Sequence, residues 1–292
     1  MANKATTINE QVEILKSRGL IFDSGIEKVK EVLLDIGYYR LGFYWSPFEI
    51  DKDHNFKPGT KFSDVLALYY LDVDLKNILV RILNRIEINF KTQLIYFASN
   101  QYNKDSIWFT NNKIAENSFV EGFYNFYNKN IKTINNKPIQ KHHLKYRNHK
   151  YAPAWKTIEF MSLGSTINLY DALLNESLKR TIAKQYDVLS LQNFKNYLKT
   201  IRYIRNICAH SDLLFDANTN FTILSSPQIP IENHKTHSLD TSIRVILYFL
   251  SQISKKRYME YKDAINELFK VNSNNQVLKT IITHKIGYNK SY

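Results

Sequence analysis

The sequence predicts an all-α protein built as a helical bundle. Apolar residues recur at three- and four-residue steps along most of its 292 residues, as they do on one face of a helix. Glycine (8) and proline (6) are scarce and 44% of the chain is hydrophobic, a composition that suits a folded helical protein and argues against disorder. There is no convincing alternation of strands and turns and no internal repeat. A chain of this length can bury a sizeable core in one large domain or two small ones.

Residues 1–59 are expected to form a helical lead region. Thr7 and Glu10 have the spacing of a capping box, and the apolar pattern after them stops near Gly19, which predicts a first helix. Residues 25–37 predict a second, short helix. The aromatic stretch YYRLGFYWSPFEI is interrupted by Gly42 and Pro47; it is compatible with a helix end followed by an extended piece, but its pattern gives no single assignment.

Residues 60–272 are expected to form the main helical domain, and its strongest helical signal runs from Ser63 to about Ser99. More than thirty residues there lack glycine and proline, which predicts one long helix or two nearly collinear helices. The apolar positions that carry this signal are Leu75, Ile78, Leu79, Ile82, Leu83, Ile86 and Phe90.

The second half of the chain alternates helical and irregular stretches. Polar, basic and asparagine-rich sequence predicts a long exposed connection, a basic loop, over residues 128–153. Proline-containing sequence predicts a second irregular connection over residues 213–237. The expected helices cover residues 153–174, 178–187, 190–210, 238–253 and 255–271, and residues 273–292 are expected to form a polar tail.

Composition also limits the class of function. The formal net charge of +13 attracts polyanions, of which nucleic acid is the commonest in a cytoplasm. The alternative is a coding bias, because the chain is rich in Lys, Asn, Ile and Tyr. The longest apolar runs, LALYYL and VILYFL, are too short to span a bilayer, and the N-terminal stretch has no apolar core typical of a signal peptide. We therefore expect a cytoplasmic protein without membrane contact. A single cysteine excludes an intramolecular disulfide and a cysteine-based zinc site.

The helix expected over residues 190–210 carries a polar track. At about 100° per residue, its apolar residues lie on one side, where Cys208 packs as a small apolar side chain. A narrow basic stripe about 22 Å long lies on another side and ends in a histidine. The alternative is an ordinary solvated face. The stripe consists of Lys195, Lys199, Arg202, Asn206 and His210.

Arg205 departs from this pattern, because it lies about 140° around the helix from His210, near the edge of the apolar face. A guanidinium is not buried alone, so we expect it to pair with a carboxylate, to face a second subunit or to bind a ligand phosphate. Glu87 and Glu159 are the candidate carboxylates, since each lies in an apolar helical stretch. The alternatives are solvent-facing glutamates and, for Arg205, a purely structural salt bridge.

The basic loop is a second candidate surface. Its cations are Lys141, Lys145, Arg147 and Lys150, and they suit contacts to an RNA backbone, with Tyr146 or Tyr151 stacking on a base. The alternative is a solvated loop. The histidines of this loop lack a nearby cysteine or carboxylate, so no metal site is expected. These histidines are His142, His143 and His149. A smaller cluster at residues 255–257 is expected to serve solubility.

The stretch IRYIRNICAHSDLLFD, residues 201–216, resembles the C-terminal signature of the Abi-like (AbiD/AbiF) abortive-infection proteins, which belong to the HEPN superfamily of helical ribonucleases. The segments EQVEILKSRGL, IGYYRLGFYWSPF, LYYLDVDLKNILVRILNRIEINFKTQLIY and APAWKTIEFMSLGSTINLYDALL are similar to further regions of that family, in the same order. The resemblance covers most of residues 8–215. Many relatives carry a second histidine after the motif histidine, where this chain has Ser211.

The resemblance implies a HEPN-like helical bundle with an N-terminal extension, and metal-independent cleavage of RNA by its own 2′-hydroxyl. His210 would then act as general base or acid, and Arg205 would stabilise the charge that gathers in the transition state. Asn206 would bind a phosphate oxygen or orient the histidine. HEPN proteins commonly pair about a two-fold axis, so the resemblance also implies a homodimer whose motif helices face each other. It implies no cofactor.

Two classes of function remain open at this stage. The first is a defence ribonuclease or toxin that cleaves cellular or phage RNA. The second is a non-catalytic RNA-binding protein on the same fold, in which His210 is structural. A small structured noncoding RNA is a possible partner in either class, as substrate, inhibitor or antitoxin.

Overall fold

The computed structural model describes residues 5–132, 136–210 and 212–292. Within these ranges the chain forms helices and loops, with three isolated β-bridges and no β-sheet. The predicted all-α class is therefore confirmed. The division into a lead region, a main domain and a tail stays a prediction.

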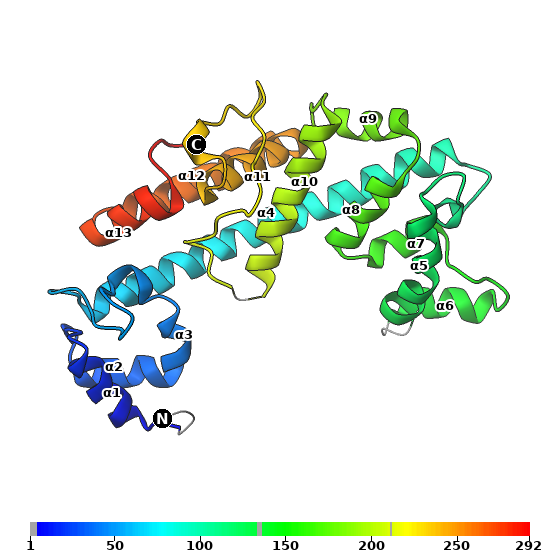
Figure 1. The fold of residues 1–292 in the computed structure, drawn as a ribbon. Helices are drawn as coiled ribbons and strands as arrows, with labels where there is room; N and C mark the ends of the chain where they lie inside the picture. Colours follow the sequence, from blue (N-terminus) through cyan, green and yellow to red (C-terminus); the bar gives the residue numbers. More distant parts are fainter. Residues whose placement is uncertain (1–4, 133–135, 211) are drawn as a thin grey trace.

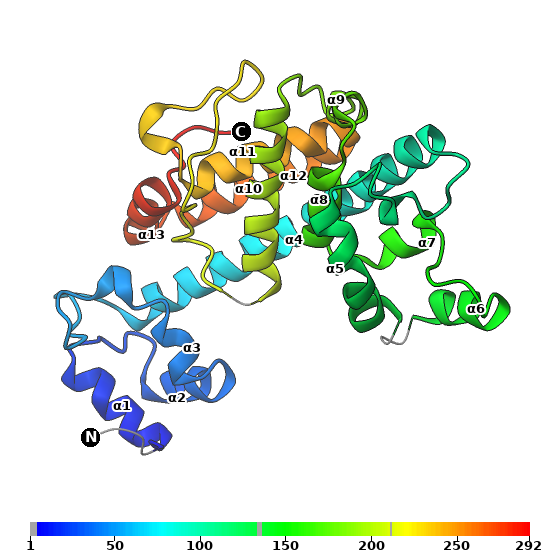
Figure 2. The same cartoon turned by 45° about the vertical axis from the view of Figure 1, so that its right-hand side comes forward.

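The helix α4 (Phe62–Gln101) is the spine of the molecule. Its 40 residues form one uninterrupted helix about 60 Å long, which confirms the strongest helical signal of the sequence. Figures 1 and 2 show the N-terminal helices at one end of α4, α5 to α7 at the other end, and α10 to α12 beside its middle. Its buried apolar side chains recur at three- and four-residue steps, and include Leu68, Leu71, Leu75, Leu79, Ile82, Ile86 and Phe90.

The lead region begins with the predicted capping box. The Glu10 N–H donates to Thr7 Oγ1 (3.3 Å), and the Thr7 N–H donates to Glu10 Oε2 (2.7 Å). After the second helix, the aromatic stretch that the sequence left unassigned forms a short helix and a 3-10 turn. The elements are α1 (Ile8–Ser17), α2 (Ile26–Asp35), α3 (Tyr38–Gly42) and the turn Ser46–Phe48.

The basic loop expected over residues 128–153 is partly helical, so that expectation was wrong. Ile139 and Tyr151 are both buried, and the Tyr151 ring packs against Phe109 and Phe123 of the preceding segment. This polar stretch therefore has an apolar side that its composition does not reveal. The helix α5, which precedes this stretch, was not predicted from the sequence. The elements are the 3-10 turn Trp108–Thr110, α5 (Asn117–Tyr127), the π-helix Asn128–Lys132 and α6 (Lys137–Lys145).

The single helix expected over residues 153–174 is broken in two. Met161 is extended, and the Ser162 side chain accepts a hydrogen bond from the Ser165 N–H (3.1 Å), so a new helix begins there. The elements are α7 (Ala154–Thr157), the 3-10 turn Ile158–Phe160 and α8 (Leu163–Ala172), followed by α9 (Glu176–Lys184).

The C-terminal elements complete the core. Residues 213–237 are irregular, as predicted, apart from the 3-10 turn Asn233–Lys235. The expected polar tail instead forms α13 (Gln276–Ile281) and the π-helix Ile282–Ile286, whose buried leucine and isoleucines pack on the bundle. The remaining helices are α10 (Leu191–Ala209), α11 (Leu239–Ile253) and α12 (Lys255–Asn272).

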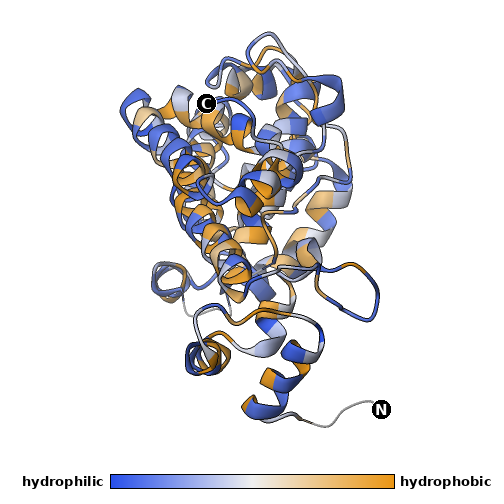
Figure 3. Ribbon diagram, turned by 90° about the vertical axis from the view of Figure 1, so that its left-hand side faces the viewer, coloured by the Kyte–Doolittle hydropathy of each residue, from blue (hydrophilic) through white to orange (hydrophobic). Residues whose placement is uncertain are grey.

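Figure 3 shows hydrophobic and hydrophilic positions on the same helices, as expected of amphipathic helices around a shared core. Within the described residues, none of these helices combines the length and the apolar character that crossing a bilayer requires.

Candidate functional site

The helix α10 carries the predicted motif and matches its predicted bounds. It begins at an N-cap, where the Asn193 N–H donates to Ser190 Oγ (3.2 Å). It ends at His210, whose N–H donates to the Asn206 carbonyl (3.0 Å). Its apolar face is buried, with Phe194, Tyr197, Leu198, Ile201 and Ile204 each 0% exposed.

Arg205 faces α4 and pairs there with Glu87, one of its two candidate carboxylate partners. The Arg205 Nε lies 3.6 Å from Glu87 Oε2, and the two side chains are 32% and 13% exposed. Glu87 also pairs with Lys91 Nζ (2.9 Å). The Arg205 guanidinium is thus held at the core edge and remains partly open to solvent.

Glu159 was the other candidate and does not pair with Arg205 in the described structure. Its side chain is exposed, and only its backbone carbonyl takes part, accepting a hydrogen bond from Lys91 Nζ (3.2 Å). The sequence could not separate the two glutamates, because both lie in apolar stretches. Their difference arises from how α10 crosses α4.

His210 is exposed at the C-terminal end of α10. Within the described part of the chain, its imidazole makes no hydrogen bond or ion pair. Ser211, the position at which the family resemblance predicts a second histidine, lies outside the described residues. One chain therefore presents an accessible imidazole and a partly accessible guanidinium five residues apart near the end of the same helix.

The loop that follows His210 is anchored by Asp72 of α4, a residue that the sequence analysis missed. The Leu214 and Phe215 N–H groups donate to Asp72 Oδ1 (3.0 and 2.7 Å), and the Tyr44 hydroxyl donates to Oδ2 (2.7 Å). Lys76 Nζ lies 2.6 Å from the same oxygen. Asp72 is 0% exposed, so its charge is compensated entirely by these groups.

A signal for this anchor was present in the sequence. Asp72 and Lys76 fall between Leu68, Leu75 and Leu79 on the apolar stripe of α4, where a charged residue requires a partner. No helical period could identify that partner, because it is the backbone of a loop about 140 residues further along the chain.

Cys208 lies beside this anchor and is no candidate nucleophile. Burial raises the pKa of its thiol to about 12, with the charge of Lys76 opposing the shift and that of Asp72 adding to it. At neutral pH the side chain is therefore a thiol, and packing accounts for it.

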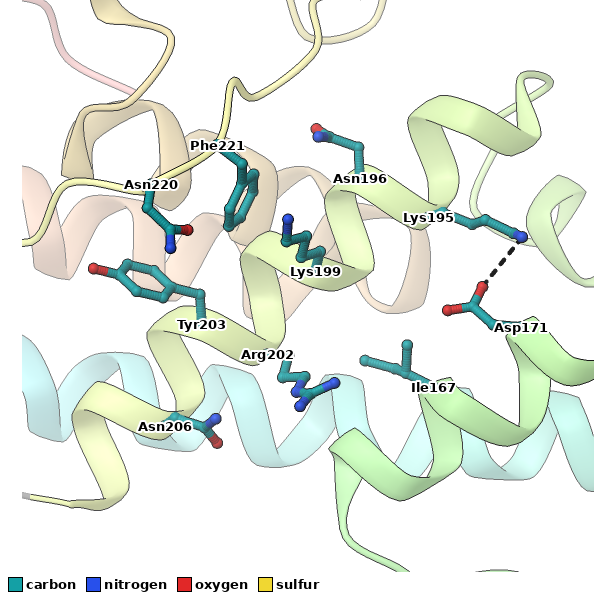
Figure 4. Close-up of a pocket in the computed structure, with 10 residues that line it drawn as sticks. All are labelled: Ile167, Asp171, Lys195, Asn196, Lys199, Arg202, Tyr203, Asn206, Asn220 and Phe221. Carbon is teal, nitrogen blue, oxygen red and sulfur yellow. Dashed lines mark ion pairs between the residues drawn. The ribbon is translucent and has the colours of Figure 1, made fainter. Parts of the chain in front are cut away.

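The basic stripe lines a surface pocket of about 490 Å³ between α8, α10 and the irregular segment around Phe221. Figure 4 shows Lys195, Lys199, Arg202 and Asn206 along one wall of this pocket. Lys195 Nζ lies 3.5 Å from Asp171 Oδ1. The structure thus brings four members of the predicted stripe together, while Arg205 and His210 do not line the pocket.

Four cations of the segment that was expected to form the basic loop are exposed: Lys141, Lys145, Arg147 and Lys150. Tyr151 is 7% exposed and belongs to the core, so the hypothesis that it stacks on a base was wrong. Tyr146 is 40% exposed, but its ring stacks on His149 (4.9 Å between centroids).

The histidines of this segment pack against aromatic rings. His143 Nε2 lies 2.8 Å from the Tyr127 hydroxyl, and His142 Nε2 lies 3.3 Å from His149 Nδ1. Burial lowers the pKa of His142 and, with a contribution from Lys132, that of His143. Among the described residues, no group of three or more His, Cys, Asp or Glu side chains has a metal-binding arrangement.

Comparison with known proteins gives one match. The family model described as Abi-like protein matches residues 31–216, well over half of the chain, and this range includes α4, α8 and α10. No curated protein and no solved structure matches the chain.

Proposed function

The chain belongs to the Abi-like family of abortive-infection proteins, and from this premise we propose that it is a metal-independent endoribonuclease acting through Arg205, Asn206 and His210. The observation that carries the proposal is the position of His210. An imidazole exchanges protons near neutral pH, and this one lies free and exposed at the end of the motif helix.

The reaction is the attack of an RNA 2′-hydroxyl on the adjacent phosphorus. The bond between the 2′-oxygen and phosphorus forms, the bond between phosphorus and the 5′-oxygen breaks, and a cyclic phosphate and a free 5′-hydroxyl result. His210 takes the proton from the 2′-hydroxyl or gives one to the leaving 5′-oxygen. Arg205 stabilises the negative charge on the phosphate oxygens, and Asn206 binds a phosphate oxygen or orients the histidine.

Arg205 pairs with Glu87 and forms no hydrogen bond with His210 within the described part of one chain, which supports a site shared between two copies. In a homodimer with facing motif helices, the partly exposed Arg205 of one protomer and the free His210 of the other converge on one phosphate. Glu87 then holds the guanidinium in place before RNA binds. The absence of that hydrogen bond from the described part of the chain also supports the alternative function, a non-catalytic RNA-binding protein that holds a small structured RNA.

The test is cleavage of labelled RNA in EDTA. We expect wild-type protein to cleave and both Arg205→Ala and His210→Ala to be inactive. The control is His234→Ala, an exposed histidine far along the chain, with a side chain 74% exposed. Tight RNA binding without cleavage by the wild type would instead establish the alternative function.

Mixing the two inactive variants tests the shared site. If Arg205 and His210 act across the interface, random mixing gives one intact site in each mixed dimer and restores about a quarter of the wild-type activity. If the mixture stays inactive while dimers exchange, the two residues do not act in trans.

A further inference from the structure

The pocket that the basic stripe lines has one wall that hydrogen bonds to α10 hold in place. Its outer wall is the irregular segment 218–225, which side chains of α10 hold at several points. The Asn196 amide donates to the Thr222 carbonyl (2.9 Å) and its oxygen accepts from the Leu224 N–H (2.9 Å). The Tyr203 hydroxyl donates to the Asn218 carbonyl (2.9 Å). The wall is therefore in place before any ligand arrives.

The floor of this pocket carries uncompensated positive charge. Lys195 has a carboxylate partner in Asp171, but Lys199 and Arg202 form no ion pair with any described residue. Among the described residues Arg202 has one hydrogen-bond partner, with Nη1 donating to Asn168 Oδ1 (3.4 Å), which leaves most of its N–H donors available. Two unpaired cations side by side favour an anionic ligand.

Gly164 makes room for Arg202. A Cβ atom at this position would lie 3.2 Å from the Arg202 Nε, so the absence of a side chain lets the Arg202 side chain approach α8 closely. The cation therefore lines the pocket together with Lys199, on the side of α10, while Phe221 belongs to the irregular segment (Figure 4).

The pocket also offers an aromatic wall and free amides. The ring of Phe221 lies beside Tyr203 (6.3 Å between centroids) and under Lys199 Nζ (3.9 Å from the centroid). The side-chain amides of Asn206 and Asn220 line the pocket and make no hydrogen bond to the described residues. Aromatic rings that stack on a base, amides that bind its edges and cations that bind phosphates are the components of a single-stranded RNA site.

The spacing of these residues leads toward the motif histidine. Lys199, Arg202, Asn206 and His210 follow one another at three or four residues, roughly one per helical turn of about 5.4 Å. A strand whose phosphates follow this row passes the pocket and reaches the end of α10. A duplex keeps its bases stacked and paired, so it cannot place one against Phe221.

We propose that this pocket is a subsite that holds one unstacked nucleotide of a single-stranded RNA next to the cleaved bond, with the phosphate on Lys199 and Arg202 and the base against Phe221. The inference rests on the proposed function in that it takes RNA as the ligand. It adds that the substrate is single-stranded at this position, and it assigns the residues that select it.

The experiment measures binding, so that it stays separate from cleavage. Fluorescence anisotropy in EDTA follows a labelled single-stranded oligonucleotide and its duplex, with His210→Ala protein as the common background. The variants are Lys199→Gln with Arg202→Gln, and Phe221→Ala. The matched control is Lys256→Gln with Arg257→Gln, which removes the same charge from the exposed start of α12.

Removing the two pocket cations should lower the slope of log affinity against log salt by roughly 1.4, as expected for two lost phosphate contacts to a single strand. Phe221→Ala should weaken binding of the single strand by about 5- to 150-fold, the range for one stacked base. The control pair should leave the single-strand affinity within about twofold of the background, since surface charges far from the ligand are screened.

Single-strand binding that is unchanged in both pocket variants overturns the subsite and leaves the proposed function standing. Equal affinity for the duplex, with no effect of Phe221→Ala, overturns it as well. If no protein in the series binds RNA, the proposed function itself fails, and the subsite with it.

Discussion

Asp72→Asn should destabilise the fold and weaken the site at the same time. In the native chain this carboxylate pairs with Lys76, accepts from two N–H groups of the loop after His210, and accepts from Tyr44. Asparagine keeps an oxygen for the two N–H groups but removes the charge that faces Lys76. The Lys76 side chain is only 10% exposed, so its ammonium is left nearly buried and unpaired.

Breaking a buried ion pair from one side costs roughly 3–5 kcal/mol, and the lower end applies here because the asparagine oxygen still accepts. A loss of about 3 kcal/mol lowers Tm by roughly 6–12 °C in a chain of this size class. Asp74→Asn is the matched control, because Asp74 is exposed two residues away on the same helix, and it should change stability by less than about 0.5 kcal/mol.

The assay is thermal unfolding, followed by far-UV circular dichroism, of four proteins: wild type, Asp72→Asn, Asp74→Asn and the double variant Asp72→Asn with Lys76→Met. The double variant removes both charges and should recover most of the lost stability. A Tm for Asp72→Asn equal to that of the wild type, or a double variant as unstable as Asp72→Asn, would refute the ion-pair account of this anchor.

Two further predictions follow from pKa shifts. Cys208, the single cysteine, should resist iodoacetamide at pH 8 in the native state because its thiol pKa is about 12. It should react fully once urea unfolds the protein. Rapid labelling of the native protein would contradict the burial of this thiol. The lowered pKa values of His142 and His143 mean that the unfolded chain binds more protons below pH 6.5, so stability should fall as pH drops from 6.5 toward 5. Urea midpoints at pH 7.5 and 5.5 measure this loss, which should shrink in His142→Asn; an equal loss in that variant would assign it to other groups.

Helices with a continuous apolar stripe could be predicted from the sequence, and α4 and α10 are the clearest cases. Both keep three- and four-residue spacing over many turns, so their period alone predicts their bounds and their buried faces. The same helical period predicts that α10 ends near His210 and that it carries a polar stripe.

Elements held by distant partners could not be predicted. The helix α6 is polar along most of its length and is buried only at Ile139, which belongs to the hydrophobic core, and at His142. The Ser162 side chain caps a new helix in the middle of the segment 153–174. The apolar pattern of this segment continues through Ser162, so the pattern predicted one helix where there are two. The helix α13 did leave a signal, since its buried residues are three or four apart, but the surrounding polar residues outweighed it.

The candidate site shows the same division. That Arg205 needs a partner follows from its charge and position alone. Glu87 was one of two candidate carboxylates, beside a second subunit or a ligand phosphate, and only the crossing of α10 and α4 selects it. The pocket wall at Phe221 lies in an irregular segment with no period, and it exists because α10 side chains hydrogen-bond to its backbone. Sequence patterns therefore predict which residues are available for chemistry, while the fold decides which of them share a site.

The central claim is that an arginine and a histidine cleave RNA through its own 2′-hydroxyl without a metal, and the chemistry of the product ends tests it most directly. In EDTA, wild-type protein should leave a 2′,3′-cyclic phosphate and a 5′-hydroxyl, and a single 2′-deoxy substitution at the cleaved nucleotide should abolish cleavage there. Products with a 5′-phosphate, or undiminished cleavage at the 2′-deoxy position, would contradict the claim.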